Sequence, residues 1–138
     1  MTLQEKNKQF YCNYIASVTG KPKPHELLIQ FIEDEKLIEH VLFFEKLFPE
    51  YQIIIDDLMA EGNWIFVRAH IIGKHEGEAD GIPITHKNVE APFALGYEIK
   101  NEKIMDFWAI GNELELFEQM GLAREQVEVK KIKEPGID

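Results

Sequence analysis

Apolar residues recur at helical spacing in the first third of the chain and at every second position in much of the remainder. Proline-rich segments interrupt the helical third, and prolines end helices firmly. We therefore expect three helices, over residues 3–19, 25–32 and 35–48. The third is expected to begin after the N-cap residue Asp34 and to stop before Pro49.

Alternating patterns then predict strands joined by short turns at 61–63 and 100–102 and by a long polar loop at 76–87. The expected strands are residues 51–60, 64–73, 88–99 and 103–110. In the long loop, Ile82-Pro83-Ile84 is a candidate lid in a segment that is expected to be mobile. Helices followed by consecutive antiparallel strands indicate an α+β fold.

The pattern after the last strand predicts one more helix, 113–120. Asn112 is expected to be its N-cap, and Gly121 is expected to end it. The charged residues that follow are either an edge strand, through Val127 and Val129, or a loose tail.

Both faces of the best strand are substantially apolar. Trp64, Phe66, Arg68 and His70 share one face, and the residues between them are all apolar. An antiparallel sheet with water on one side should alternate cleanly. The helices can cover one face, and a second subunit is the simplest cover for the other.

Length and charge narrow the function classes. The 138 residues favour a single domain over 1–138. The formal net charge of −10 argues against nucleic acid and anionic membranes as partners. The chain has a single cysteine, Cys12, and no visible signal peptide or membrane-spanning run, so a cytoplasmic protein is expected. Cys12 is interpreted as a small buried hydrophobic residue.

Several segments in order resemble one known family. They are Phe48-Pro49-Glu50-Tyr51, Asp57-Leu58-Met59-Ala60-Glu61-Gly62, Gly73-Lys74-His75-Glu76-Gly77, Gly81-Ile82-Pro83-Ile84-Thr85, Lys103-Ile104-Met105-Asp106-Phe107-Trp108 and Phe117-Glu118-Gln119-Met120-Gly121. Together they resemble the SnoaL-like polyketide cyclase, or ester cyclase-like, family of the nuclear transport factor 2-like superfamily. The resemblance covers a core of about residues 5–122 and leaves 123–138 as a tail.

The resemblance implies a cone-shaped fold in which three N-terminal helices lie against a curved antiparallel sheet around a mainly apolar pocket. It also implies a homodimer through the sheet. In the characterised cyclases an Asp four residues after the strand Trp acts as general acid and base. Asn112 stands at the matching position here, after Trp108, and an amide does not transfer protons in the working pH range.

Three residues are the candidate catalytic group, each with a structural alternative. His70 is a candidate base or carbonyl hydrogen-bond donor, or else a structural histidine. Asp106 is a candidate general base on the pocket wall, or else a rim carboxylate in water. Asn112 is a candidate donor to a ligand carbonyl, or only a helix cap.

Four further residues are candidate ligand contacts: His40, Phe66, Arg68 and Trp108. In the resembled family a histidine near His40 often faces the cavity, although a helix-surface position is the alternative. Arg68 either binds a substrate anion or pairs with Glu90 or Asp106. Trp108 is expected in the core or the pocket wall.

Metal and nucleotide motifs are not found in the sequence, so no metal site and no cofactor are expected. Three function classes remain. One is a cofactor-independent acid/base cyclase or isomerase acting on an apolar carbonyl compound. Another is a ligand-binding or accessory protein without proton transfer, which Asn112 favours. The third is an interaction module with a filled pocket.

Overall fold

The computed structural model describes residues 1–78 and 81–121, in which four helices and four strands follow one another in the order αααββββα. The helices are α1 (Leu3–Val18), α2 (His25–Leu28), α3 (Glu35–Leu47) and α4 (Glu113–Gln119). The strands are β1 (Gln52–Glu61), β2 (Trp64–Lys74), β3 (Asn88–Lys100) and β4 (Lys103–Gly111). The predicted α+β order is confirmed.

Side-chain caps fix where the helices begin. Thr2 accepts from the Glu5 amide, and the Glu5 carboxylate accepts from the Thr2 amide in return, which forms a capping box for α1. Asp34 caps α3 as predicted. Helix α2 is shorter than the predicted 25–32, because residues after Leu28 leave the helix and Ile32 forms a parallel bridge with Ile104.

The strands form one antiparallel sheet in the order β1-β2-β3-β4. A bulge in β1 between Ile55 and Asp57 turns both Asp56 and Asp57 toward the outer face, so that Ile53, Ile55 and then Leu58 keep facing inward. A second irregularity lies between Glu98 and Ile99 of β3. Such bulges raise the local twist of a sheet.

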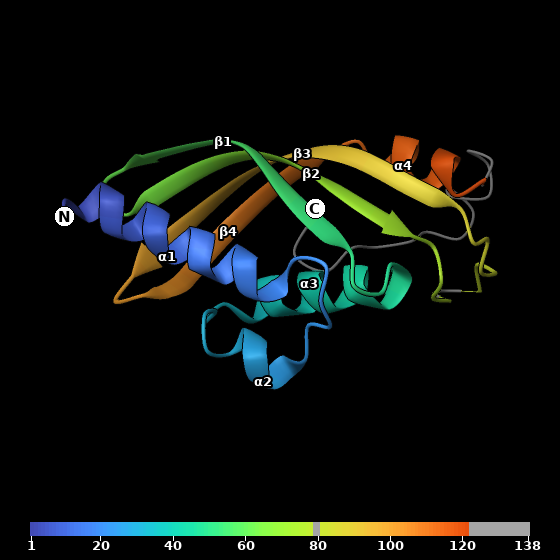
Figure 1. The fold of residues 1–138 in the computed structure, drawn as a ribbon, viewed down its shortest axis with the longest axis horizontal. Helices are drawn as coiled ribbons and strands as arrows, with labels where there is room; N and C mark the ends of the chain where they lie inside the picture. The colour runs from blue at the N-terminus through green and yellow to red at the C-terminus, as the bar shows by residue number, and fades with distance from the viewer. Residues whose placement is uncertain (79–80, 122–138) are drawn as a thin grey trace.

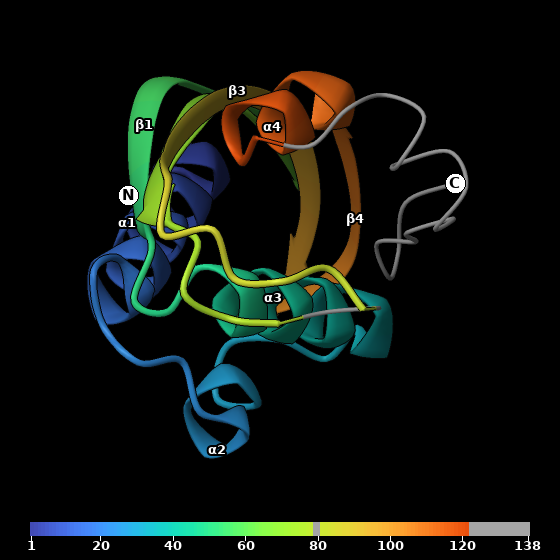
Figure 2. The ribbon, with the colours of Figure 1, turned by 90° about the vertical axis from the view of Figure 1, so that its right-hand side faces the viewer.

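The curved sheet arches over the helices (Figure 1), and the end-on view shows β1, β3 and β4 around an interior with α3 across the open side (Figure 2). Helix α1 lies beside β1. Helix α4 lies near the end of the arch and is joined to β3, because Gln119 accepts from the Glu90 amide at 2.7 Å and donates to the Glu90 carbonyl at 2.8 Å.

The core fills the space between the inner sheet face and α1 and α3. It is strongly aromatic, with Tyr11, Tyr14, Phe48 and Tyr97 all at 5% exposure or less. One sequence interpretation is wrong here: Cys12 is exposed, because it lies on the outward side of α1 next to the buried Tyr11.

The loop after β2 is held by backbone hydrogen bonds. His75 and Lys87 pair at 2.9 Å, and the amides of Glu76 and Gly77 both donate to the Leu47 carbonyl at 3.1 Å. Ile82 is buried in the core at 2% exposure. No helix among residues 1–78 and 81–121 is long and apolar enough to cross a membrane. The proposed edge strand at Val127 and Val129 lies outside the described residues.

Candidate functional site

A cavity of about 40 Å3 lies inside the cone, between α1, α3 and the inner face of the sheet. Its walls come from every one of these elements: Tyr14 of α1, His40 and Phe44 of α3, Tyr51 at the start of β1, and Phe93 and Tyr97 of β3. Water needs roughly 10–15 Å3 of such space per molecule, so the cavity has room for a few small atoms. Aromatic side chains therefore fill most of the cone, a property that the sequence alone left open.

His40 gives this cavity its titratable imidazole. Helical spacing places it on the same face of α3 as Phe44, four residues later, and the two rings meet edge-to-face at 4.8 Å. The residue is 7% exposed, so the helix-surface alternative is wrong. Burial lowers the pKa of His40 to about 4, while the charge of Glu113 acts in the opposite direction. The imidazole is therefore neutral at pH 7.

Three tyrosines supply the other polar groups of the cavity wall. Burial raises the pKa of Tyr14 and Tyr51 well above the usual value and that of Tyr97 to about 12. Their hydroxyls stay protonated and act as hydrogen-bond donors and acceptors. Among the described residues that line the cavity there is no Asp, Glu, Lys or Arg, so its surface is neutral.

Three of the predicted site residues lie on the outer face of the sheet. Phe66, Arg68 and His70 of β2 alternate with the inward-facing Val67 and Ala69. None of the three lines the cavity. His70 Nδ1 lies 2.9 Å from the Asp56 carboxylate, one of the two aspartates that the β1 bulge turns outward.

Arg68 has a partner that the sequence did not suggest. Its guanidinium pairs with Asp57 at 2.6 Å, and not with Glu90 or Asp106 as expected. The β1 bulge supplies this partner, because Asp57 lies directly across from Arg68 in the β1–β2 register.

Two predicted residues of β4 also point away from the cavity. Trp108 is 39% exposed and its ring lies over Gly96, the residue opposite it on β3. Asp106 lies at the rim, 3.5 Å from Lys36 Nζ, and accepts from the Phe107 amide. Of the seven predicted site residues, the structure brings only His40 to the cavity.

Asn112 is the N-cap of α4. Its Oδ1 accepts from the Glu115 amide at 3.0 Å, and the residue is exposed and absent from the cavity wall. The next residue, Glu113, is the one whose charge acts on His40. The carboxylate whose charge acts on His40 thus belongs to Glu113, one residue after the position at which the resembled family has its catalytic Asp.

His70 and His75, the two histidines closest in sequence on and after β2, do not come together as ligands of one metal ion. His70 lies on the outer face, whereas His75 is fully buried under the loop after β2, where its Nδ1 accepts from the Thr85 amide at 3.2 Å. Among residues 1–78 and 81–121, no three His, Cys, Asp or Glu side chains are placed to hold a metal ion.

Comparison with known families identifies the chain. A family model described as SnoaL-like polyketide cyclase matches residues 32–120, about two thirds of the chain. The chain belongs to the SnoaL-like polyketide cyclase family. No curated protein matches this SnoaL-like chain.

Solved structures share the fold of this SnoaL-like protein at low sequence identity. A protein from Jannaschia sp. CCS1, described as a SnoaL-like polyketide cyclase, matches with a TM-score of 0.74 at 13% identity, over 89% of this chain and 96% of its own. One from Acidithiobacillus ferrooxidans, described as a polyketide cyclase, gives 0.73 at 18% identity, over 88% and 98%. AclR of Streptomyces galilaeus, described as a hydroxylase, gives 0.73 at 16%, over 93% and 91%. The cone-shaped fold expected of this family is confirmed.

Sequence reasoning missed Glu113 and the tyrosines of the cavity wall. Tyr14 was readable as a core position of the first helix, but nothing in its spacing distinguishes a cavity wall from a filled core. Glu113 had a usable signal, because it begins a helix directly after the last strand and therefore lies at an end of the cone.

Proposed function

We propose that the cone cavity binds a compact, largely apolar carbonyl compound, and that His40 is the side chain that meets its carbonyl oxygen. The observation that carries this proposal is a neutral imidazole in a cavity otherwise walled by apolar and tyrosine side chains. A neutral histidine has one N–H donor to offer a carbonyl, and the tyrosine hydroxyls can supply a second. A ligand anion would find no cation among the described lining residues.

The size of the cavity limits the ligand. Ordinary ligand pockets enclose roughly 300–1,000 Å3. A cavity of about 40 Å3 admits only a small molecule unless the aromatic walls move. A short ketone such as acetone suits this cavity best, a single small ring fits only if an aromatic wall moves, and a fused-ring polyketide fits less well still.

The test measures affinity for ketones of increasing size: acetone, cyclopentanone, cyclohexanone and acetophenone. Binding is followed by NMR titration of wild type, His40→Phe and a control, His70→Gln, which changes a histidine on the outer face. We expect the smaller ketones to bind best. We also expect His40→Phe to lower affinity at least about tenfold, as the loss of a buried hydrogen bond implies, and His70→Gln to leave it unchanged. Equal affinity in wild type and His40→Phe, or the same loss in both variants, overturns the proposal.

Acid/base turnover, as in a cyclase or isomerase, is the second candidate. The charge of Glu113 favours it, since that carboxylate counteracts the effect of burial on the His40 pKa and would stabilise the imidazolium formed during turnover. In this reaction the proton on the carbon beside the carbonyl passes to His40. The C–H electron pair forms the enolate, which tyrosine hydroxyls can stabilise, and the proton returns to another position.

Deuterium exchange separates turnover from binding. Wild-type protein in D2O should exchange the protons beside the carbonyl of cyclopentanone faster than buffer does, and Glu113→Gln should slow this exchange while binding persists. Binding without protein-dependent exchange leaves a non-catalytic ligand-binding protein, the alternative that Asn112 favoured.

The outer sheet face is the proposed contact with a second copy of the chain. Trp64, Phe66 and Trp108 form a continuous aromatic row with ring centroids 6.5 Å apart, and Ile110 and Met59 beside it are 69% and 65% exposed. On this face Arg68 pairs with Asp57, and His70 Nδ1 lies beside the Asp56 carboxylate. The aromatic row is an apolar surface on which two copies of a chain with net charge −10 can meet away from most of its charges.

Light scattering tests the dimer. A mass near twice the chain's 16.1 kDa is expected for wild type at micromolar concentration, and Trp108→Glu should return the monomer mass. Ile29→Glu, an exposed apolar position away from the sheet, is the control and should stay dimeric. A wild-type mass near 16.1 kDa contradicts this part of the proposal.

A further inference from the structure

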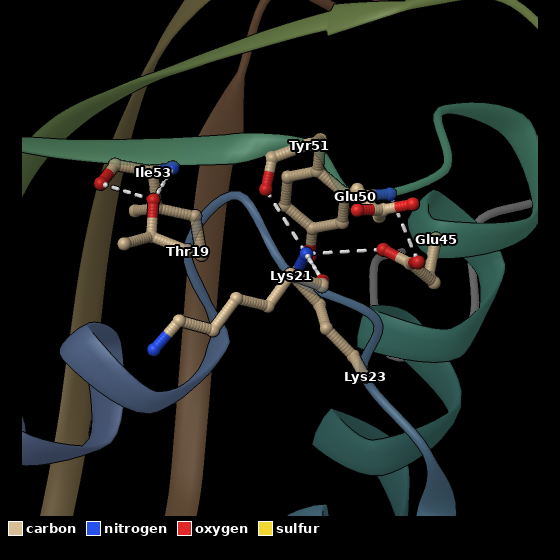
Figure 3. A network of polar contacts seen from close by, with 7 residues as sticks. All are labelled: Thr19, Lys21, Lys23, Glu45, Glu50, Tyr51 and Ile53. Atoms are coloured by element: carbon tan, nitrogen blue, oxygen red, sulfur yellow. Dashed lines mark hydrogen bonds and ion pairs between the residues drawn. The ribbon is translucent and has the colours of Figure 1, made fainter.

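A lysine is buried where the link between α1 and α2 passes beneath the start of β1. Lys23 lies between Pro22 and Pro24, and its side chain is wholly buried. Its ammonium group points at Tyr51 and Glu45, as Figure 3 shows. The neighbouring Lys21 is exposed, and its Nζ points away from this cluster (Figure 3). Lysine is among the residues that are least often buried, so a buried one needs an explanation.

All three ammonium protons of Lys23 have acceptors. They are the Lys21 carbonyl at 2.9 Å, the Tyr51 carbonyl at 3.0 Å and Glu45 Oε1 at 3.0 Å. The ammonium nitrogen also lies 4.0 Å from the centre of the Tyr51 ring, within range of a cation–π contact. Burial lowers the pKa of Lys23, and the hydrogen bond and charge of Glu45 oppose that shift.

The acceptors of Lys23 belong to the elements that form two walls of the cavity. Glu45 follows Phe44 on α3, the helix that also carries His40. Tyr51 precedes β1, and its ring is itself part of the cavity wall, 6.3 Å from the Phe44 ring. The second oxygen of Glu45 accepts from the Glu50 amide at 2.9 Å, so the same cluster also holds the turn between α3 and β1.

The attachment of β1 to α1 does not depend on Lys23. The Gly20 amide donates to the Tyr51 carbonyl at 3.0 Å, and Thr19 bonds both the amide and the carbonyl of Ile53 (Figure 3). What Lys23 adds is the connection from β1 to α3. A buried ion pair is by itself weak evidence for stability, since desolvation offsets much of its attraction. Three directed hydrogen bonds from one ammonium group can, however, fix the relative positions of the elements that accept them.

We propose that Lys23 is a positioning residue: by binding Tyr51 and Glu45 together it fixes α3 against the start of β1, and so sets the shape of the cavity and the place of the Tyr51 ring in its wall. The consequence for ligand affinity rests on the proposed function, whereas the consequence for cavity geometry does not.

The experiment compares wild type with Lys23→Met, the double variant Lys23→Met/Glu45→Gln, and Lys21→Met as a matched control in the same linker. The single change leaves the Glu45 carboxylate in a half-buried place without its cation and should destabilise the fold. The double variant removes both charges, and the amide oxygen that replaces the Glu45 carboxylate can still accept from the Glu50 amide. It should therefore recover most of the stability that the single change loses in urea unfolding.

NMR without ligand then reads the geometry. In the double variant we expect shifted ring resonances for Tyr51 and His40 and a changed His40 pKa, while Lys21→Met keeps the wild-type values. Lys23→Arg, which keeps the charge, should preserve the resonances better than the methionine variant. With cyclopentanone, the double variant should bind about tenfold more weakly, an ordinary result of misplaced contacts.

Two outcomes overturn the role of Lys23. One is a folded double variant with wild-type Tyr51 and His40 resonances. The other is a double variant that fails to fold, because the cluster would then be required for folding and not for positioning. If wild type binds no ketone, the proposed function fails, and the resonances alone decide for or against Lys23.

Discussion

The inner and outer faces of the sheet carry similar residue types in opposite environments. Each face carries aromatic rings, and a candidate histidine lies on each side of the sheet. Neighbouring residues of β2 point to opposite faces. On the inner side, His40 is buried against Phe44 and its pKa falls to about 4. On the outer side, His70 lies beside the Asp56 carboxylate with a quarter of its side chain exposed.

The difference shows that the environment, and not the residue type, decides whether a histidine is held neutral inside the protein or lies beside a carboxylate near the surface. The inner face is enclosed and holds its polar groups neutral. The outer face pairs Arg68 with Asp57 and leaves apolar rings uncovered. The first arrangement suits a small neutral ligand, and the second suits another protein surface.

The largest expected contrast comes from removing one phenylalanine ring on each side. Phe44 is 3% exposed and contacts rings on several sides, so Phe44→Ala should cost about 3–5 kcal/mol of unfolding free energy. Phe66→Ala, on the half-exposed outer face, should cost about 1 kcal/mol or less when measured in dilute monomer. Urea unfolding of both variants in the Trp108→Glu background, which is expected to be monomeric, measures both losses. Equal losses would mean that the two faces are buried to the same degree.

The next prediction concerns the pH dependence that the buried His40 gives to the inner side. The His40 pKa is lowered from 6.5 to about 4, so above pH 6.5 both the folded and unfolded forms are neutral and the shift has no effect on stability. As pH falls from 6.5 to 4, the unfolded chain binds a proton that the folded one does not. Stability should therefore drop by about 3 kcal/mol over this window, at about 1.4 kcal/mol for each pKa unit.

A His40 variant separates the contribution of His40 from that of the carboxylates, which titrate in the same pH range. The difference in unfolding free energy between wild type and His40→Phe should therefore change across pH 6.5 to 4. A His40 pKa near 6.5 in an NMR titration would contradict the buried, neutral state.

The fold is largely predictable because its signals are local. Asp34 at the start of α3 and the glycine turn at Gly62 mark element ends through their own backbone chemistry, and the structure has α3 and the first hairpin where they are expected. The prediction for the second helix is too long because the bridge from Ile32 to Ile104 is a contact across more than half the chain, which no local pattern reveals.

The site is less predictable. Strand alternation shows which residues share a face of the sheet, but it does not show which of the two faces points inward. The sequence places Phe66, Arg68 and His70 on the pocket face, but the intervening Ile65, Val67, Ala69 and Ile71 are the buried set. The β1 bulge adds a second difficulty. It places Asp56 and Asp57 on one face, which strict alternation forbids, and thereby supplies the partners of His70 and Arg68.

Two glycines give a smaller and closely matched comparison. A Cβ at Gly111 would overlap the buried Phe93 ring inside the cone, and one at Gly96 would overlap the half-exposed Trp108 ring outside it. Gly111→Ala should cost about 1–3 kcal/mol, because the buried Phe93 ring can yield only into the small cavity that it lines. Gly96→Ala should cost less in the monomer, because Trp108 can rotate into solvent. Thermal unfolding of both variants measures the difference, and a larger loss at Gly96 would show that Trp108 is held rigidly.

The smallest expected effect belongs to Asn112, the position that the family resemblance marked for catalysis. As a cap alone, Asn112→Ala should cost roughly 1 kcal/mol through the lost bond to the Glu115 amide. Asn112→Asp should stay within a few tenths of a kcal/mol of wild type, because Asp and Asn cap about equally well and a negative charge suits a helix N-terminus. Neither variant should alter ketone affinity or its pH dependence, since the side chain is exposed and outside the cavity wall. A pH-dependent change in binding or exchange in the Asp variant, with stability kept, would place proton transfer at residue 112 after all and move the active region from His40 toward the end of the cone.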